Sequence, residues 1–108
     1  MPQWRIRDRT TFHRLRADGQ RRRSGPVTVT ALAIDDGNPP RVAFAIGTRV
    51  GGAVTRNRLR RQLRAVVADL APPSGAYLVT VRPEAAACTT GELRDHLASA
   101  LTGLGSRP

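Results

Sequence analysis

Three runs of alternating apolar residues and one long amphipathic segment limit this 108-residue chain to a sheet with helices packed on it. Residues 27–34, 41–47 and 76–82 carry apolar, often β-branched, side chains at every second position, which predicts strands. Residues 51–70 instead repeat apolar side chains at helical spacing, after two glycines. We therefore expect an α+β fold, and a single domain over residues 1–108.

Further helices are expected near both ends of the chain. Asp8 or Thr10 can cap a first helix, and Gly19 is placed to end it. Thr89 and Glu92 match the capping box that starts a last helix. The predicted order is helix, strand, strand, helix, strand, helix.

Two segments are interpreted as connections. Residues 21–26, Arg-Arg-Arg-Ser-Gly-Pro, look like a basic connector. Residues 35–40 have the composition of a turn, which predicts that the strands on either side of it are antiparallel neighbours.

The charge of the chain is strongly positive and uneven. The formal net charge is +10, and all eighteen basic residues are arginine. Residues 1–64 hold fifteen arginines and four aspartates, and residues 37–68 hold seven arginines with no acid. This distribution indicates a polyanionic partner such as a nucleic acid.

Other destinations and partners fit less well. No apolar stretch approaches the ~18 residues that span a bilayer, and the basic segment lacks the aromatic residues typical of membrane-surface helices. Cys88 is the only cysteine, so no intrachain disulfide can form. We expect a cytoplasmic protein with no membrane partner.

The segment at residues 51–64 has the composition of a phosphate-binding site. Its two glycines expose backbone N–H groups at the start of a helix. Its arginines lie on an arc beside the apolar stripe, and guanidinium groups bind phosphate oxygens in pairs of hydrogen bonds.

A catalytic site of the protein's own is not expected. Hydrolysis by the protein would need clustered carboxylates for metal ions, a histidine base or an activated nucleophile. The acids of residues 1–64 are scattered, and His13 and His96 lack the spacing of metal ligands. We therefore predict no catalytic and no metal-binding residue in this chain.

The central segment resembles the RNR motif of the bacterial ribonuclease P protein family. The motif matches here at Gly51, Ala53, Val54, Arg56, Asn57, Arg58, Arg60, Arg61 and Arg64. The strand before it, and the pattern of Arg5, Ile6, Phe12, Leu15 and Gly19, are also similar to the family.

The resemblance implies a fold and a function. The fold is a two-layer α+β sandwich of the ribosomal protein S5 domain 2-like type, with a left-handed β-α-β crossover. The family protein is a monomer within a ribonucleoprotein, where it binds the ribonuclease P catalytic RNA and precursor tRNA. The complex is an endoribonuclease that removes the 5′ leader, and its Mg²⁺ is held mainly by the RNA subunit.

The resemblance also assigns residues to two surfaces. The RNA-binding residues would be Arg49, Arg56, Asn57, Arg58, Arg60, Arg61 and Arg64. A cleft for the leader, between the first helix and the sheet, would involve Phe12, Arg16 and Thr30. Arg16 and Thr30 stand where the family usually has aromatic residues, so leader binding is expected to depend more on arginine than on stacking.

An alternative is a structural RNA-binding protein of ribosomal type, without a role in tRNA processing. It would share the arginine content and the lack of catalytic groups. The Arg56-Asn57-Arg58 motif between strand and helix favours ribonuclease P. An autonomous nuclease would need more carboxylates, and a DNA-binding protein would need a recognition helix that the sequence does not indicate.

Overall fold

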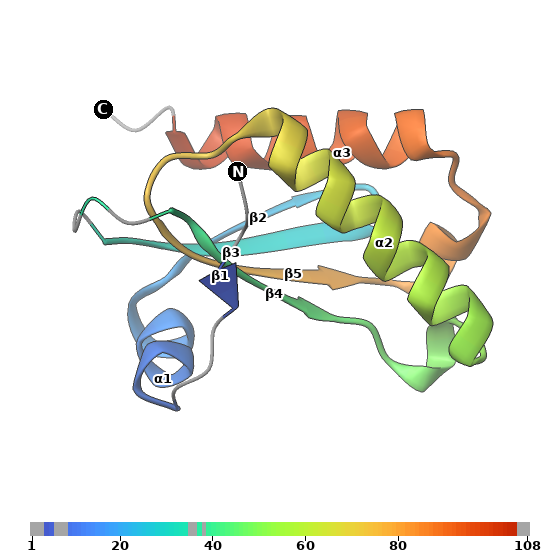
Figure 1. Ribbon diagram of the computed structural model, residues 1–108, viewed down its shortest axis with the longest axis horizontal. Helices are drawn as coiled ribbons and strands as arrows, with labels where there is room; N and C mark the ends of the chain where they lie inside the picture. The colour runs from blue at the N-terminus through green and yellow to red at the C-terminus, as the bar shows by residue number, and fades with distance from the viewer. Residues whose placement is uncertain (1–3, 6–8, 35–36, 38, 106–108) are drawn as a thin grey trace.

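A computed structural model describes residues 4–5, 9–34, 37 and 39–105 (Figure 1). The predicted helices and strands are all present, with two additional strands, of two and five residues, and two short 3₁₀ helices. In chain order the elements are β1 (Trp4–Arg5), α1 (Arg9–Asp18), β2 (Gln20–Ser24), β3 (Val27–Ala33), β4 (Arg41–Ala45), η1 (Thr48–Val50), α2 (Ala53–Leu70), β5 (Gly75–Val81), η2 (Pro83–Ala87) and α3 (Thr90–Gly105).

The strands form one mixed sheet in the order β1-β4-β5-β3-β2. β5 pairs antiparallel with β3 and parallel with β4, so it lies between them. The prediction that β3 and β4 are neighbours was therefore wrong. Because β5 offers apolar side chains on both faces, it takes the buried central position.

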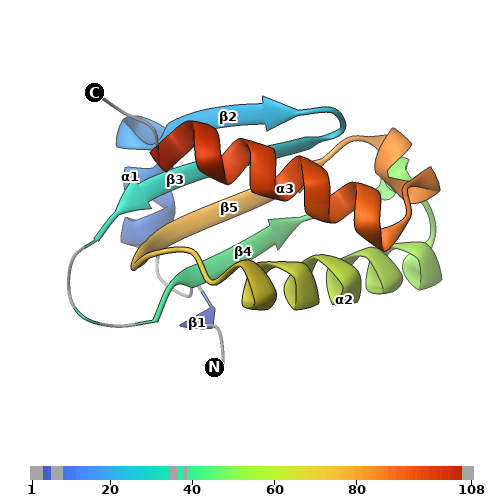
Figure 2. The ribbon, with the colours of Figure 1, turned by 90° about the horizontal axis from the view of Figure 1, so that it is seen from above.

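The parallel strands β4 and β5 are joined through α2. Figure 2 views the sheet from the side of α2 and α3. With β4 and β5 turned to point upward, the chain leaves β4, passes in front of the sheet through α2 and enters β5 on the left of β4, which is a left-handed crossover. Right-handed crossovers are the general rule. The left-handed crossover expected from the family resemblance is confirmed.

Each face of the sheet carries its own apolar cluster. α2 and α3 cover one face, where Val29, Val79, Leu59 and Leu97 are almost completely buried. α1 covers part of the other face, where Leu15 packs with the partly buried residues Phe12, Leu32, Ile34, Ala43 and Leu78. The sheet therefore separates the α2 and α3 layer from α1.

The basic segment after α1 is a strand rather than a connector. β2 pairs antiparallel with β3 from Gln20 opposite Ala31 to Ser24 opposite Val27. The two residues of the hairpin turn are Gly25 and Pro26, and Gly25 has φ +56°. A glycine with positive φ at the first turn position is typical of a type II′ hairpin.

The expected ends of the first and last helices are largely confirmed. The Gly19 amide donates to the Leu15 carbonyl oxygen at 2.9 Å and ends α1. Of the two predicted caps, Asp8 lies outside the described residues, and Thr10 is wrong because it lies inside α1, which begins at Arg9. At α3 the Thr89 amide donates to Glu92 Oε1 at 2.8 Å, and the Glu92 amide donates to Thr89 Oγ1 at 3.1 Å. This reciprocal pair is the predicted capping box.

No described helix combines the length and the apolar character that crossing a membrane requires.

Candidate nucleic-acid interface

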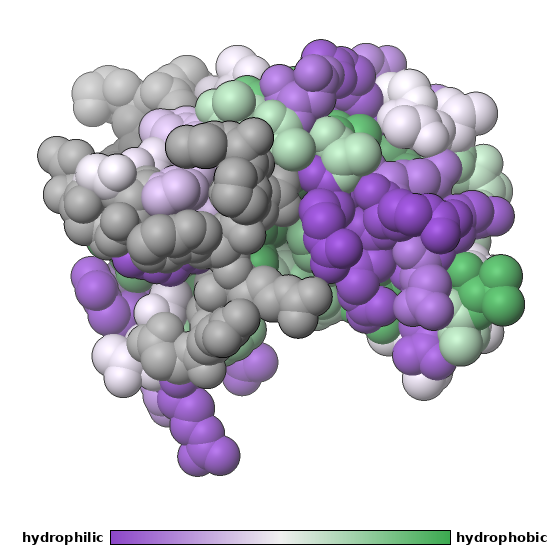
Figure 3. All heavy atoms as spheres, in the orientation of Figure 1, coloured by the Kyte–Doolittle hydropathy of each residue, from purple (hydrophilic) through white to green (hydrophobic). Residues whose placement is uncertain are grey.

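The helix α2 separates an apolar face from an arginine-rich one. Leu59, Leu63, Val66 and Val67 are buried against the sheet and α3, as their spacing predicts. The side chains of Asn57, Arg58, Arg61 and Arg64 are exposed, and Arg60 is partly exposed. Figure 3 shows hydrophilic side chains gathered over α2. We call the surface of Arg49, Arg56, Asn57, Arg58, Arg60, Arg61 and Arg64 the α2 face.

Two contacts orient side chains of the α2 face. Arg58 Nη2 donates to the Ala86 carbonyl oxygen at 2.8 Å, which ties α2 to η2. Arg60 Nη1 donates to Asn57 Oδ1 at 3.3 Å, one helical turn away. The guanidinium groups of Arg58 and Arg60 are thus held partly in place before any ligand binds.

Arg56 is the most enclosed arginine of the motif. Its side chain is half-buried, and its Nε is shielded from solvent without a hydrogen-bond partner. An unsatisfied buried donor costs about 1–3 kcal/mol.

The loop before α2 adds exposed groups on the same side. Arg49 is exposed in η1, and Gly52 takes the N-cap position of α2 without a side-chain cap. Val54, in the first turn of α2, is 85% exposed, and among the described residues it is the large apolar side chain that stands out to solvent. Its exposure did not follow from the sequence pattern, since apolar motif residues are usually buried.

The three predicted cleft residues lie on the sheet face that α1 covers, in different environments. Phe12 is half-buried and packs on the cluster around Leu15. Thr30 is 7% exposed, beneath the end of α1 near Gly19. Arg16 is exposed on α1. Phe12 is thus partly a core residue, and Arg16 is the most accessible of the three.

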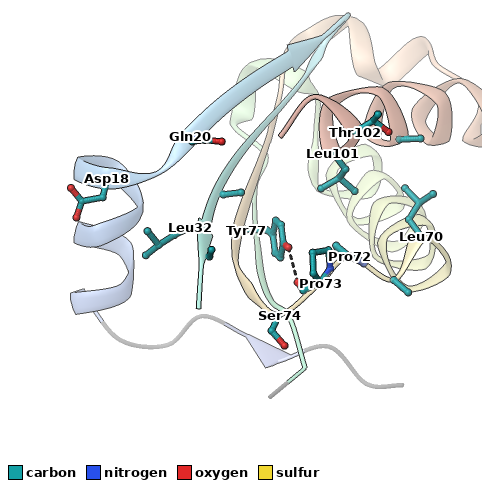
Figure 4. Close-up of a pocket in the computed structure, with 14 residues that line it drawn as sticks. Asp18, Gln20, Leu32, Leu70, Pro72, Pro73, Ser74, Tyr77, Leu101 and Thr102 are labelled. Carbon is teal, nitrogen blue, oxygen red and sulfur yellow. Dashed lines mark hydrogen bonds between the residues drawn. The ribbon is translucent and has the colours of Figure 1, made fainter. Parts of the chain in front are cut away.

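A separate hollow of about 810 Å³ lies where β3 ends and β5 begins. Figure 4 shows Tyr77, Pro73 and Leu101 around it, with Asp18 and Leu32 on the far side of β3. The Tyr77 hydroxyl donates to the Pro73 carbonyl oxygen at 2.6 Å, and burial raises the pKa of this hydroxyl. The lining is mostly apolar and brings no catalytic set together.

The two histidines of the chain lie on different helices, α1 and α3. His13 is exposed on α1, whereas His96 Nδ1 lies 3.0 Å from Ser24 Oγ. Burial, and to a lesser extent the charge of Glu92, raises the pKa of the Cys88 thiol, which disfavours the nucleophilic thiolate. Within the described ranges no three His, Cys, Asp or Glu side chains could together hold a metal ion.

Sequence reasoning did not assign a surface to the arginines of β2. Arg21, Arg22 and Arg23 are all exposed on this edge strand. The signal was present as three consecutive basic residues, but a run of like charges without apolar alternation does not indicate a strand.

Comparisons with known proteins agree with the fold and the motif. The sequence model of the Ribonuclease P family matches residues 1–105. The ribonuclease P protein component of Beutenbergia cavernae is 46% identical over 87 residues, which cover 75% of this chain and 71% of that protein. The component of Clavibacter michiganensis subsp. michiganensis is 40% identical over 87 residues, covering 78% and 77%.

Solved structures show the same fold at lower identity. The RNase P protein of Staphylococcus aureus superposes with a TM-score of 0.83 at 20% identity, covering 95% of this chain and 96% of that one. The RNase P protein of Thermotoga maritima gives a TM-score of 0.76 at 20% identity, covering 88% and 94%. The chain therefore belongs to the ribonuclease P protein family, the protein components of a tRNA-processing ribonucleoprotein.

Proposed function

We propose that this protein binds the catalytic RNA of ribonuclease P through the α2 face and holds the 5′ leader of precursor tRNA beside α1. The RNA subunit carries out the hydrolysis that releases the leader. The single observation that carries the proposal is the α2 face itself, five arginines on one helix with no acid before Asp69.

The geometry of the α2 face supports binding to folded RNA. Arg61 and Arg64 are exposed one turn apart, and Arg60 is oriented by Asn57. Guanidinium groups at such spacing can bind successive phosphates along a backbone. Arg56 adds a further guanidinium group at the start of α2, where Gly52 leaves the helix N-terminus without a side-chain cap.

The leader site is proposed on the sheet face next to α1. Phe12 supplies the ring on which a base can stack, and Arg16 supplies a positive charge on the same helix. Thr30 lies below the end of α1, where it shapes the floor more than it contacts RNA. Leader binding here depends on few aromatic groups and therefore on phosphate contacts.

Mg²⁺ does not fit the described part of this protein. The acids Asp18, Asp69, Glu84, Glu92 and Asp95 are distributed over separate elements and form no cluster. We therefore derive no step through a protein-bound metal, and we propose that the RNA subunit holds Mg²⁺. The protein binds and positions RNA.

Reconstitution tests this function directly. Purified protein is mixed with a bacterial ribonuclease P RNA and precursor tRNA at low Mg²⁺, where RNA alone reacts slowly. We expect cleavage at the mature 5′ end to be stimulated by the complex, and no cleavage by the protein alone. Arg94→Ala, which removes an exposed arginine of α3, is the matched control for arginine substitutions on α2.

The same experiment distinguishes the proposed function from the alternative one. Protein that binds structured RNA without stimulating leader removal would be a structural RNA-binding protein of ribosomal type. Protein that binds neither the catalytic RNA nor precursor tRNA would contradict both functions.

A further inference from the structure

The strand β2 places its three arginines on opposite faces of the sheet. Arg21 pairs with Thr30 and Arg23 with Thr28, whereas Arg22 pairs with Val29. Since residues directly opposite each other on paired strands share a face, Arg21 and Arg23 belong to the face of α1. Arg22 belongs to the face of α3.

Contacts outside the sheet confirm this alternation. A Cβ added at Gly103 of α3 would lie 3.3 Å from Arg22 Cδ, so the Arg22 side chain packs beneath α3. The next residue along that face, Ser24, hydrogen-bonds to His96 of α3. On the opposite face, the Thr30 methyl group lies against the end of α1 at Gly19.

Arg23 begins a row of side chains that crosses four strands. The pairings place Arg23 opposite Thr28, Thr28 opposite Thr80, and Thr80 opposite Ala45. Three strand spacings of about 4.8 Å make this row about 14 Å long. Thr28 and Thr80 are partly exposed and Ala45 is exposed.

The row has different neighbours at its two ends. Beyond Ala45 the chain continues into η1, which contains Arg49, and then to the start of α2. At the other end β2 is the free edge of the sheet. Figure 1 shows α1 beneath only one end of the sheet, and the side chains buried against it come from the end of β3 and the start of β5. The row of small and polar side chains lies toward the other end.

We propose that Arg21 and Arg23 bind phosphates of the single-stranded 5′ leader where it leaves the sheet at the β2 edge. This inference rests on the proposed function and extends the leader path from the region of Phe12 to the free edge. Thr and Ala side chains offer no stacking surface, so the chemistry of this row favours a sugar-phosphate backbone rather than particular bases.

The two arginines suit an extended strand in spacing and orientation. Residues two apart on a strand are separated by about 6.6–6.8 Å, close to the distance between successive phosphates of an extended single strand. Arg23 Nε donates to the Gly25 carbonyl oxygen at 3.0 Å, which anchors its guanidinium and uses one of its five N–H donors. Asp18, at the end of α1, is the nearest acid in sequence, and the other described acids belong to α2, η2 and α3.

Charged edge strands also prevent sheets from pairing edge to edge, which is the competing explanation of these arginines. If the arginines served only to prevent edge pairing, all three would contribute equally, and the affinity for RNA would not depend on the leader. Leader binding requires Arg21 and Arg23 but not Arg22. Arg22, which lies on the opposite face of the same strand, is therefore the matched control.

The test compares Arg21→Gln/Arg23→Gln with Arg22→Gln in the reconstituted complex. Affinity is measured for precursor tRNA with a long leader, for precursor tRNA with a leader of one or two nucleotides, and for mature tRNA. We expect the double variant to bind the long-leader substrate roughly tenfold more weakly and to bind mature tRNA unchanged. Its log–log salt slope should fall by about 0.7 for each lost single-strand contact. Arg22→Gln and Arg21→Lys/Arg23→Lys should retain most of the affinity.

The outcomes separate this inference from the proposed function. If the unaltered complex shows no preference for long leaders, the leader-binding function fails and this inference fails with it. If the preference is present and the double variant keeps it, the inference alone is overturned. Equal losses for precursor and mature tRNA, or self-association of both Gln variants in sedimentation with unchanged binding, would also overturn it.

Discussion

Ser24 Oγ lies 3.0 Å from His96 Nδ1 and joins the β2–β3 hairpin to α3. Beside this bond the His96 ring lies directly against Gly25, where an added Cβ would come within 2.4 Å of the ring. The hairpin therefore rests on the imidazole. Since β2 carries Arg21 and Arg23, α3 fixes the strand that presents them.

Gly25→Ala should destabilise the fold strongly. An L-residue in the left-handed region costs about 1–2 kcal/mol, and the overpacking against His96 adds about 1–3 kcal/mol. Gly37→Ala is the matched control, because Gly37 has φ +73° and its added Cβ would meet nothing within 4 Å among the described residues. Urea unfolding measures both free energies.

His96→Ala removes the ring that the new Cβ would meet. The Gly25→Ala substitution should then cost less in the His96→Ala background than in the unaltered protein, a coupling that a double-mutant cycle measures. Additive losses would contradict the contact.

Most of the elements could be predicted because their side-chain periods are clear. The stripe of Leu59, Leu63, Val66 and Val67 is buried as predicted, and Leu93 and Leu97 are completely buried on α3. The Thr89–Glu92 capping box forms as predicted. These features depend on local chemistry, which a single sequence contains.

The order of the strands could not be predicted from local chemistry. Residues 35–40 look like a hairpin turn, but the long-range pairing of β5 with both β3 and β4 separates these strands. Strand β2 was not predicted because its extended conformation depends on pairing with β3 and not on a pattern in its own residues. Arg21 to Arg23 extend along β3, and no alternation of their own indicates this.

The candidate site was predictable in part. The arginines of α2 follow from helical spacing, and their exposure agrees with it. The contact of Arg58 with Ala86 depends on η2, because Ala86 lies 28 residues later in the sequence. The burial of Thr30 similarly depends on how α1 ends at Gly19.

Acid should remove the contribution of Glu92 to stability. Hydrogen bonds from the Thr89 amide and from the Thr89 side chain lower the pKa of Glu92 below its ordinary value. A lowered folded-state pKa means that the contribution is complete above the unfolded pKa, about 4.3, and is lost as pH falls through the folded value. The measurement is the free energy of unfolding between pH 7 and pH 3.

Glu92→Gln is the control for this pH dependence, because the amide cannot ionise. The difference in unfolding free energy between the two proteins should favour the native residue at pH 7 and shrink toward pH 3. A difference that stays constant across this range would mean that the carboxylate charge does not contribute.

Arg58→Ala should lower stability more than Arg61→Ala. Arg58 donates to the Ala86 carbonyl oxygen at 2.8 Å, and loss of such a bond costs about 0.5–1.5 kcal/mol. Arg61 is an exposed arginine of the same helix and should change the unfolding free energy by less than about 0.5 kcal/mol. Thermal unfolding compares them, and equal stabilities would show that the contact with η2 is not formed in solution.

Phe12 substitutions should separate packing from stacking. Phe12→Ala removes a half-buried ring and should cost about 1–3 kcal/mol of stability, less than the 3–5 kcal/mol of a fully buried one. Phe12→Leu keeps most of the apolar contact but cannot stack on a base. If Phe12 contacts the leader, Phe12→Leu should weaken binding of precursor tRNA and leave mature tRNA unaffected. Equal effects on the two RNAs would identify Phe12 as a core residue only.

The α2 face should determine how strongly RNA binding depends on salt. Replacing Arg60, Arg61 and Arg64 together by alanine should weaken binding to the ribonuclease P RNA. Each lost phosphate contact on duplex-like RNA should reduce the log–log salt slope by about 0.9. Arg94→Ala on α3 removes an arginine that forms an ion pair with Asp69, and it should leave the slope unchanged. Filter binding over a range of KCl concentrations measures both slopes. A triple variant that keeps the original slope would mean that the RNA lies against another surface of the protein.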